Sequence, residues 1–260
     1  MELNLKDKRV LVTGGNSGLG AAMAEAFAAE GARVAINYHN NAEGAEHMAE
    51  AFKAKGNDAL ALGADVSDAD AVEEMFARLD AAWSGIDILV NNAGMDGAPA
   101  KAWDIDIADW TKVIEVNLKG AFLCARQALK RMVMQRSGVI LNTSSVHEVI
   151  AWSGYSAYAA SKAGLSMLAK TLAQEAAPYG VRVLSIAPGA IKTAINQSVW
   201  SDPEGLKDLL TKIPLGRMGV PEDVAGMMVV LASNVGGYVT GTSIFVDGGM
   251  SDYPEFAHGG

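Results

Sequence analysis

Short runs of hydrophobic residues alternate with longer helix-like stretches along almost the entire chain. Seven of these runs are expected to form strands, at residues 10–12, 34–36, 59–62, 86–90, 139–142, 181–186 and 243–246. Runs of this kind, bounded by turn residues and separated by helical patterns, are typical of parallel strands that are buried on both faces. The sequence therefore predicts an α/β protein with a seven-stranded parallel sheet that is covered by helices on both sides.

Turn and capping residues lie where such a βα series needs them. The segment 67–70 and Pro221 mark helix starts, and glycines at 31, 56, 85 and 180 mark helix ends. No proline-rich linker, charge run or fixed repeat interrupts the series. We therefore expect one domain that spans residues 1–260.

One long connection, from Pro188 to about Pro214, lacks clear periodicity and contains a turn-forming segment at 201–205. Long connections in compact domains often act as lids over a site. A surface excursion with a short helix is an equally good interpretation. We therefore describe residues from about 190 to 213 as a lid-like segment.

Composition excludes several classes of function. The formal net charge of −9 disfavours a broad binding surface for nucleic acid or for an anionic membrane. The single cysteine, Cys124, has no partner for an intrachain disulfide, which fits a helix-packing residue in a reducing compartment. The polar residues 1–8 lead directly into the first strand. We expect a cytoplasmic protein with no membrane segment, and we assign no metal site.

A glycine-rich turn at residues 13–20, with the sequence TGGNSGLG, follows the first strand and precedes an alanine-rich helical pattern at 21–30. Glycines let the backbone approach a pyrophosphate closely, and a helix N-terminus supplies free N–H groups and a positive dipole end. The order of strand, glycine turn and helix therefore predicts a dinucleotide-binding unit.

The end of the second strand, Asn37-Tyr38-His39, is where the adenosine ribose of such a dinucleotide is expected. It lacks the acidic residue that repels a 2′-phosphate, and it also lacks an arginine that selects this phosphate. His39, Asn16 and Ser17 are able to accommodate either form. We therefore expect use of both NAD and NADP, with a preference for NADP.

Tyr158 and Lys162 are the strongest candidates for redox chemistry. A spacing of four residues places a phenol and an ammonium on one face of a helix, where the cation favours the phenolate form. The tyrosine then becomes a usable proton acceptor. The spacing alone is weak, because it also recurs on solvated helix faces.

Five signatures together resemble the short-chain dehydrogenase/reductase family over nearly the whole chain. They are the turn 13–20, the segment Asn91-Asn92-Ala93-Gly94, Ser145, the pair Tyr158 and Lys162, and Pro188-Gly189. The resemblance implies a single Rossmann-type domain with a doubly wound seven-stranded sheet, a nicotinamide cofactor and a homotetramer.

The resemblance also implies catalytic roles for four residues. Tyr158 matches the family's base, and Lys162 matches the lysine that lowers the pKa of that base and holds the nicotinamide ribose. Ser145 matches the serine that binds the reacting oxygen. Asn117 matches an asparagine that distorts its helix and places water on a proton path to the lysine.

Cofactor contacts follow from the same resemblance. It implies the phosphate turn at Gly14, Gly18 and Gly20, adenine contacts at Asp65 and Val66, ribose-proximal positions at Asn91, Ala93 and Gly94, and a carboxamide-orienting hydroxyl at Thr193. Further candidate contacts are Asn16, Ser17, Leu19, Asn37, Tyr38, His39, Tyr158, Lys162, Pro188, Gly189 and Ile191.

Four local segments, 91–96, 144–148, 189–196 and 247–256, look like those of bacterial glucose 1-dehydrogenases. This similarity implies oxidation of the C1 hydroxyl of a cyclic aldose, glucose or a close relative, to a lactone. A polyhydroxylated ring needs several directional polar partners. The candidates are Asp96, Ser145, His147, Tyr158 and Asn196, with an aromatic face of Trp152 to stack on the sugar.

Each of these substrate contacts has a structural alternative. His147 caps a strand end, Asp96 stabilises a turn, or Trp152 packs against the lid-like segment. The chain also departs from the glucose 1-dehydrogenase pattern, since Asp96 is shorter than their glutamate and residues 152–156 differ from their bulky run. Other sugars and a non-sugar polyol therefore remain open.

Two other classes of function compete with an aldose dehydrogenase. A 3-oxoacyl carrier-protein reductase, or another alcohol or ketone oxidoreductase of the same family, shares the same catalytic residues. A non-catalytic nicotinamide sensor would have no need of the complete set, so its retention argues against that class.

Overall fold

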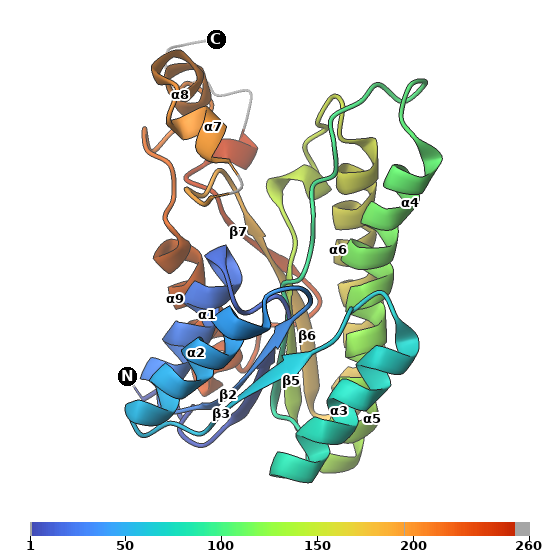
Figure 1. Ribbon diagram of the computed structural model, residues 1–260, viewed down its shortest axis with the longest axis vertical. Coiled ribbons are helices and arrows are strands. Elements are labelled where there is room, and N and C mark those ends of the chain that lie inside the picture. Colours follow the sequence, from blue (N-terminus) through green and yellow to red (C-terminus); the bar gives the residue numbers. More distant parts are fainter. Residues whose placement is uncertain (1, 195, 253–260) are drawn as a thin grey trace.

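The computed structural model describes residues 2–194 and 196–252 and contains the predicted seven-stranded parallel sheet (Figure 1). The strand order is β3-β2-β1-β4-β5-β6-β7. The strands are β1 (Arg9–Val12), β2 (Arg33–Tyr38), β3 (Ala59–Gly63), β4 (Ile88–Asn91), β5 (Gly138–Thr143), β6 (Val181–Pro188) and β7 (Ser243–Val246). Each coincides with a predicted run to within about two residues, because continuous apolar runs are buried on both faces.

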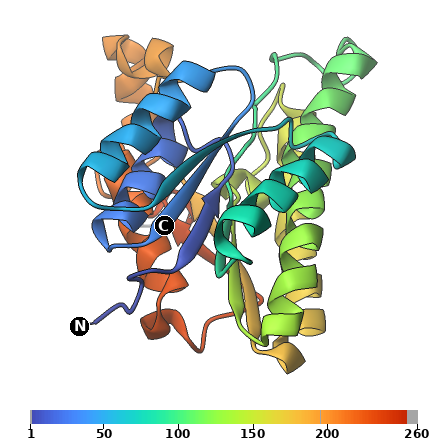
Figure 2. The same ribbon diagram turned by 60° about the horizontal axis from the view of Figure 1, so that its bottom comes forward.

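Helices cover both faces of the sheet, as predicted (Figure 2). One face carries α1 (Gly18–Ala29), α2 (Ala42–Ala54) and α9 (Pro221–Ala232). The other carries α3 (Ala69–Trp83), α5 (Ala121–Gln135) and α6 (Ser156–Ala176), with α4 (Ile107–Ile114) packed beside α6. In the described part of the chain, no helix is both long enough and apolar enough to span a membrane.

The capping signals act as the sequence predicts. The Asp68 side chain accepts hydrogen bonds from the first turn of α3, and Pro221 is the first residue of α9. The lid-like segment contains two short helices, α7 (Gln197–Trp200) and α8 (Pro203–Leu210), where one was expected. Residues 253–256 of the segment that resembles glucose 1-dehydrogenases lie outside the described residues.

The reversal of strand order at β1 decides where the site lies. The chain builds β2 and β3 on one side of β1, and then places β4 on the other side. Ligands of doubly wound sheets bind in the crevice beyond the carboxyl ends of the strands at such a reversal. The glycine turn after β1 and the segment after β4 therefore lie side by side.

A row of polar side chains crosses the sheet near these carboxyl ends. Asn91, Asn142, Ser185 and Ser243 occupy paired positions in β4, β5, β6 and β7. The Asn91 amide donates to the Asn142 side-chain oxygen at 2.9 Å, so part of the row bonds internally. The row marks the level at which the apolar core gives way to the polar site.

An ion pair fastens the opposite ends of β1 and β4. Arg9 donates to both carboxylate oxygens of Asp87 at 2.8 Å, and the two side chains are only 20% and 21% exposed. Burial favours the neutral acid, but Arg9 outweighs this effect and lowers the pKa of Asp87. The stability from this pair is therefore present above the ordinary aspartate pKa, about 4, and is lost as the pH falls.

Replacing Asp87 with alanine should lower the free energy of unfolding at neutral pH by about 3 kcal/mol, because Arg9 then lacks its partner in a largely buried position. Urea unfolding of the wild-type and variant proteins measures this difference. Glu50→Ala is the matched control, since it breaks the exposed Glu50–Lys53 pair and should cost less than about 0.5 kcal/mol. Equal costs for the two variants would contradict the structural role of Asp87.

Candidate active site

The glycine turn forms a cradle that fits a pyrophosphate. Gly14 and Gly18 have φ angles of +58° and +50°, which disfavour other residues. At Gly20, a Cβ atom would overlap the Gly14 carbonyl and approach the Asn92 amide. Because α1 begins at Gly18, the free N–H groups of its first turn face the same turn. Among the remaining candidates here, Asn16 donates to the Asn41 carbonyl at 3.2 Å and Ser17 is exposed.

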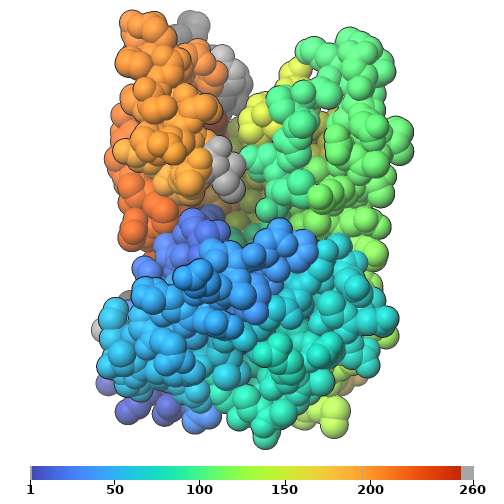
Figure 3. Space-filling model, viewed as in Figure 1, coloured from blue at the N-terminus to red at the C-terminus, as the bar shows by residue number. Residues whose placement is uncertain are grey.

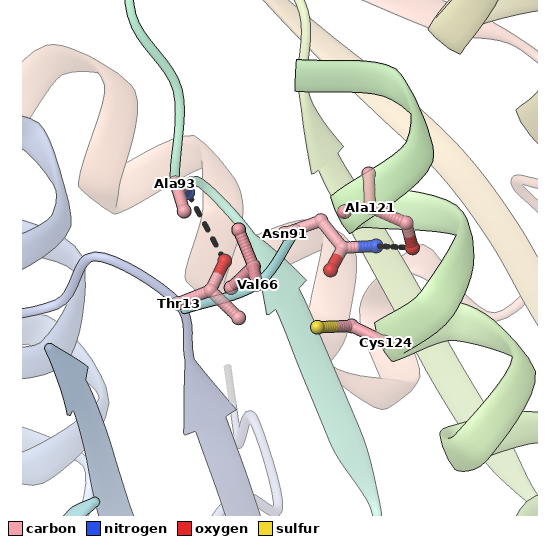
Figure 4. A pocket seen from close by; sticks show the side chains of 7 residues that line it. Thr13, Val66, Asn91, Ala93, Ala121 and Cys124 are labelled. Carbon is pink, nitrogen blue, oxygen red and sulfur yellow. Dashed lines mark hydrogen bonds between the residues drawn. The ribbon is translucent and has the colours of Figure 1, made fainter. Parts of the chain in front are cut away.

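Two residues that the sequence interpretation left without a role, Thr13 and Asn92, hold this turn against β4. Figure 4 shows the bond between Ala93 and Thr13. The Thr13 hydroxyl accepts hydrogen bonds from the backbone N–H groups of Asn92 and Ala93 at 2.9 and 3.0 Å. The Asn92 amide donates to the carbonyls of Thr13 and Gly14 at 3.1 and 3.2 Å. The sequence signal for this role was a polar residue directly after each of two strands, Thr13 after β1 and Asn92 after β4.

Asn37 supports the turn from below and is not available to a cofactor, contrary to its prediction as a contact. It is 2% exposed, and its side-chain oxygen accepts from the Gly14 N–H at 3.2 Å. Its amide donates to the carbonyls of Leu62 and Ala64 at 3.1 Å. All of its hydrogen-bonding groups are therefore satisfied within the protein.

At the adenosine end, His39 lies 3.6 Å from the Asp65 carboxylate, and both side chains are accessible to solvent. Burial favours the neutral acid, but hydrogen bonds from Ser67 and the charge of His39 outweigh it and lower the pKa of Asp65. Tyr38 is partly buried, with its ring against Gly63. The end of β2 has no acidic residue of its own, but the fold brings the Asp65 carboxylate next to it.

A small hollow beside the glycine turn contains three predicted cofactor positions, Val66, Asn91 and Ala93 (Figure 4). Asn91 is 4% exposed and donates to the Ala121 carbonyl at 3.1 Å, so its side chain serves the protein interior. Cys124 also lines the hollow, where burial raises the pKa of the thiol to about 12. This agrees with a packing role for Cys124.

The helix α6 carries Tyr158 and Lys162 on one face, as their spacing predicts. The Lys162 ammonium lies 5.5 Å from the centre of the Tyr158 ring and donates to the Thr143 carbonyl at 2.7 Å. Lys162 is 5% exposed and Ser145 is 6% exposed. Ser145 follows β5 directly, so its hydroxyl lies beside the Tyr158 phenol and acts on its pKa.

The pKa values of this pair differ from the sequence expectation. Burial raises the pKa of Tyr158 to about 12, while Ser145 acts in the opposite direction. Burial lowers the pKa of Lys162 to about 8, against the effect of nearby carboxylates. The activation of Tyr158 by Lys162 therefore stays a prediction that the resemblance implies.

Asn117 lies within a π-helix, η1 (Glu115–Gly120), that joins α4 to α5. Its side chain accepts from the Met95 N–H and donates to the Met95 carbonyl, both at 2.8 Å. It also donates to Ser161, which is on α6 beside Lys162, at 3.1 Å. The widened turn therefore directs Asn117 at both the segment after β4 and the catalytic helix.

Aromatic rings cover the substrate side. Trp152 stacks on His147 at 4.4 Å and on Tyr155 at 3.8 Å, and it meets the Tyr158 ring edge-on at 5.9 Å. Two rings of the chain therefore already stack on the indole, although Trp152 is 37% exposed. Its role as an aromatic face for a sugar stays a prediction.

The ring nitrogens of His147 have different roles. Nδ1 lies 3.0 Å from the Ile150 carbonyl. Because a carbonyl only accepts, Nδ1 carries the hydrogen and Nε2 is left as an acceptor. Burial lowers the pKa of His147, which favours this neutral form.

Asn196 makes its hydrogen bonds within its own loop, and its role as a substrate contact stays a prediction. Its side-chain oxygen accepts from the Thr193 N–H at 3.0 Å and lies 3.3 Å from the Thr193 hydroxyl. Its amide donates to the Ile191 carbonyl at 2.8 Å.

The Ile191 side chain is 7% exposed and packs in the core. Pro188 ends β6, and Gly189 approaches Asp247 too closely for a side chain.

Asp96 is the predicted contact with the most freedom. It is partly buried, and burial raises the pKa of its carboxyl against the opposing charges of Lys162 and His147. No described side chain or backbone group makes a hydrogen bond to it. Above this region, a hollow separates the arm with α7 and α8 from the arm with α4 (Figure 3).

Residues 14–251 match the family described as enoyl-(acyl carrier protein) reductase. A 3β-hydroxysteroid dehydrogenase of Eggerthella lenta is 47% identical over 258 residues, 98% of each chain. A 3-oxoacyl-[acyl-carrier-protein] reductase of Staphylococcus aureus is 41% identical, covering 94% of this chain and 98% of that one. Glucose 1-dehydrogenase 2 of Bacillus subtilis is 38% identical over 98% of this chain and 99% of its own.

The crystal structure of a levodione reductase superposes with a TM-score of 0.88 at 36% identity, over 95% of this chain and 99% of that chain. Similarity of this extent covers the sheet, the glycine turn and the region around Tyr158 together.

Gly20→Ala should weaken binding of reduced nicotinamide dinucleotide at least tenfold, because the added methyl group displaces the Gly14 carbonyl from the cradle. Fluorescence titration with the reduced cofactor measures this change. Gly226→Ala in α9 is the matched control, since a Cβ there meets no atom within 4 Å and should leave binding unchanged. Unchanged binding in Gly20→Ala would remove the turn from the cofactor site.

Proposed function

The chain belongs to the short-chain dehydrogenase/reductase family, whose members use NAD or NADP, and from this membership we propose that it oxidises a secondary alcohol on an apolar ring system. The reaction is reversible hydride exchange between the alcohol carbon and the cofactor. The proposed cradle is the turn from Gly14 to Gly20, with Lys162 and Thr193 at the nicotinamide end. The bound nicotinamide supplies the hydride acceptor and, when oxidised, a positive charge.

In this proposal the protein's own residues move one proton and orient one oxygen. Ser145 donates a hydrogen bond to the substrate oxygen, and Tyr158 takes the hydroxyl proton. Lys162 stays cationic and stabilises the phenolate. Because Tyr158 has a raised pKa, its activation needs more positive charge than Lys162 provides, so activity in the direction of oxidation should rise with pH.

The choice of substrate class depends on which side chains around Tyr158 are not already engaged by other parts of the protein. Of the four side chains predicted to bind a sugar besides Ser145 and Tyr158, Trp152 already stacks on two rings and Asn196 already bonds within its loop. Asp96 and Nε2 of His147 remain. Two polar groups beside an aromatic wall suit a rigid apolar ring with few hydroxyl groups better than a polyhydroxylated aldose.

The relatives support this choice without deciding it. The Eggerthella lenta protein, named a 3β-hydroxysteroid dehydrogenase, is 47% identical, against 38% for the glucose dehydrogenase. We therefore name a hydroxysteroid-like secondary alcohol as the substrate class. An aldose oxidised at C1 is the second candidate, because Asp96 and His147 are both polar and lie beside Tyr158. Reduction of a 3-oxoacyl thioester is the third.

We further propose that the enzyme accepts both NAD and NADP, with a preference for NADP. His39 offers a cation near the expected 2′-phosphate, whereas its partner Asp65 suits a free ribose hydroxyl. The balance between these two groups supports dual use. A single domain, a homotetramer and a cytoplasmic location complete the proposal. The homotetramer rests on family resemblance, and the other two rest on the uninterrupted βα series and the single cysteine.

Tyr158→Phe should reduce turnover by about 100-fold or more while leaving cofactor affinity unchanged, because it removes the transferable proton but keeps the ring and its stacking. Steady-state rates combined with fluorescence titration of the reduced cofactor separate the two effects. A variant that keeps a near wild-type rate would refute Tyr158 as the proton-transfer group.

Reduced-nicotinamide absorbance should rise with a 3β-hydroxysteroid, and kcat/KM for it should exceed that for D-glucose by at least tenfold. The physical reason is the small number of free polar groups around Tyr158. The assay uses NAD and NADP separately, and acetoacetyl thioester is tested in the reverse direction. Faster turnover of glucose would restore the aldose interpretation, and activity confined to the thioester would reject both ring substrates.

A further inference from the structure

The face of α6 that carries the two catalytic residues continues for one more turn. Tyr158, Lys162 and Ser166 follow one another at intervals of four residues, so they share one face of the helix. This face lies against the segment 143–148, which begins at the end of β5 and includes the short helix η2 (Val146–Glu148). The helix and the segment hold the base, the lysine and the serine of the site.

Three contacts bind the segment to the helix, one after another. The Lys162 ammonium donates to the Thr143 carbonyl at 2.7 Å, and the Ser144 hydroxyl donates to the Lys162 carbonyl at 3.3 Å. The Ser166 hydroxyl donates to Oε1 of Glu148 at 3.1 Å. Glu148 therefore fixes the far end of the segment to the helix, three residues after Ser145.

Glu148 has an unusual feature that packing does not explain. Its second carboxylate oxygen, Oε2, is buried and has no hydrogen-bond partner among the described residues. An unsatisfied buried carboxylate oxygen carries a substantial desolvation cost. A serine or alanine would fill this position without that cost, so the negative charge itself needs a function.

Lys162 is the buried cation nearest to this contact along α6, because it lies one helical turn before Ser166, the residue that Glu148 bonds. Burial lowers the pKa of Lys162 to about 8, and the carboxylates of Asp96 and Glu148 both act to raise it. Asp96 belongs to the segment after β4, and Glu148 belongs to η2.

Other charged or titratable groups near this point are few. Tyr158 and His147 lie on the substrate side and contact each other's rings. On η1, Glu115 and Lys119 are about half exposed and lie 3.7 Å apart. Within the described residues, Glu148 is therefore the half-buried acid that bonds to the catalytic helix on the face of Lys162.

We propose that Glu148 is a positioning residue that fastens the Ser145 segment to the catalytic helix through Ser166 and places a carboxylate charge one helical turn from Lys162. It acts through Lys162 and does not touch the substrate. The inference rests on the proposed roles of Tyr158 and Lys162 in the redox reaction.

Glu148→Gln tests the charge, because the amide oxygen can still accept the Ser166 hydrogen bond. In the cofactor-free protein, NMR titration of carbon-13-labelled lysine reports the Lys162 pKa directly, with Lys162→Met to identify the signal. The value of about 8 should fall by about one pH unit in Glu148→Gln. Glu148→Asp, which keeps the charge, should restore most of the wild-type pKa, and Ser166→Ala should leave it nearly unchanged.

Kinetics provide a second readout, because Tyr158 and Lys162 titrate as a pair. Ketone reduction needs both protons on the pair, whereas alcohol oxidation needs one proton lost. Glu148→Gln makes proton loss easier. The pH at which reduction declines and the pH at which oxidation rises should therefore both move to lower values. A merely structural role would lower both rates without moving either limb.

An unchanged Lys162 pKa in a folded Glu148→Gln protein would overturn the proposal, as would an equal shift in Ser166→Ala. If thermal unfolding shows that Glu148→Gln does not fold, Glu148→Met is the second neutral variant and carries the same prediction. The NMR titration needs neither substrate nor cofactor. Its failure is therefore distinguishable from failure of the proposed function, which Tyr158→Phe tests.

Discussion

The buried ammonium of Lys162 is the constraint around which the site is arranged. A cation that is 5% exposed must be compensated by hydrogen bonds and opposite charge, or it loses its proton. The Thr143 carbonyl provides the hydrogen bond, and Asp96 and Glu148 provide the charge. Because Thr143 and Glu148 come from the segment 143–148, Asp96 from the segment after β4 and Lys162 from α6, three separate parts of the chain must meet at one point.

The π-helix η1 helps to bring these parts of the chain together. A regular α-helix through η1 would direct Asn117 elsewhere, whereas the widened turn lets its side chain bond to both Met95 and Ser161. Ser161 precedes Lys162, and Met95 precedes Asp96. One asparagine therefore fixes the spacing between the lysine and one of the carboxylates that compensate its charge.

At the cofactor end, close approach of backbone rather than side-chain chemistry determines the shape. Thr13 and Asn92 bond the first turn to the end of β4, and Asn37 supports the turn from beneath. The glycines leave room for this approach and for a phosphate group. The side chains of Thr13, Asn37 and Asn92 therefore bond to the protein itself, and they hold the backbone N–H groups of the turn in position for a ligand.

The sequence by itself determined the seven strands, several helix starts and ends, the glycine turn and the shared face of Tyr158 and Lys162. Those features depend on local periodicity and on the conformational limits of glycine and proline, which neighbouring residues in the chain reveal. Only the tertiary structure decided how each polar group is used. Asn37 bonds to Gly14, Leu62 and Ala64, and Glu148 bonds to Ser166. These partners are distant in the chain, so no local pattern encodes them. Asn196 and Trp152 use partners only three to five residues away, but the folded loops decide which of those neighbours each side chain meets.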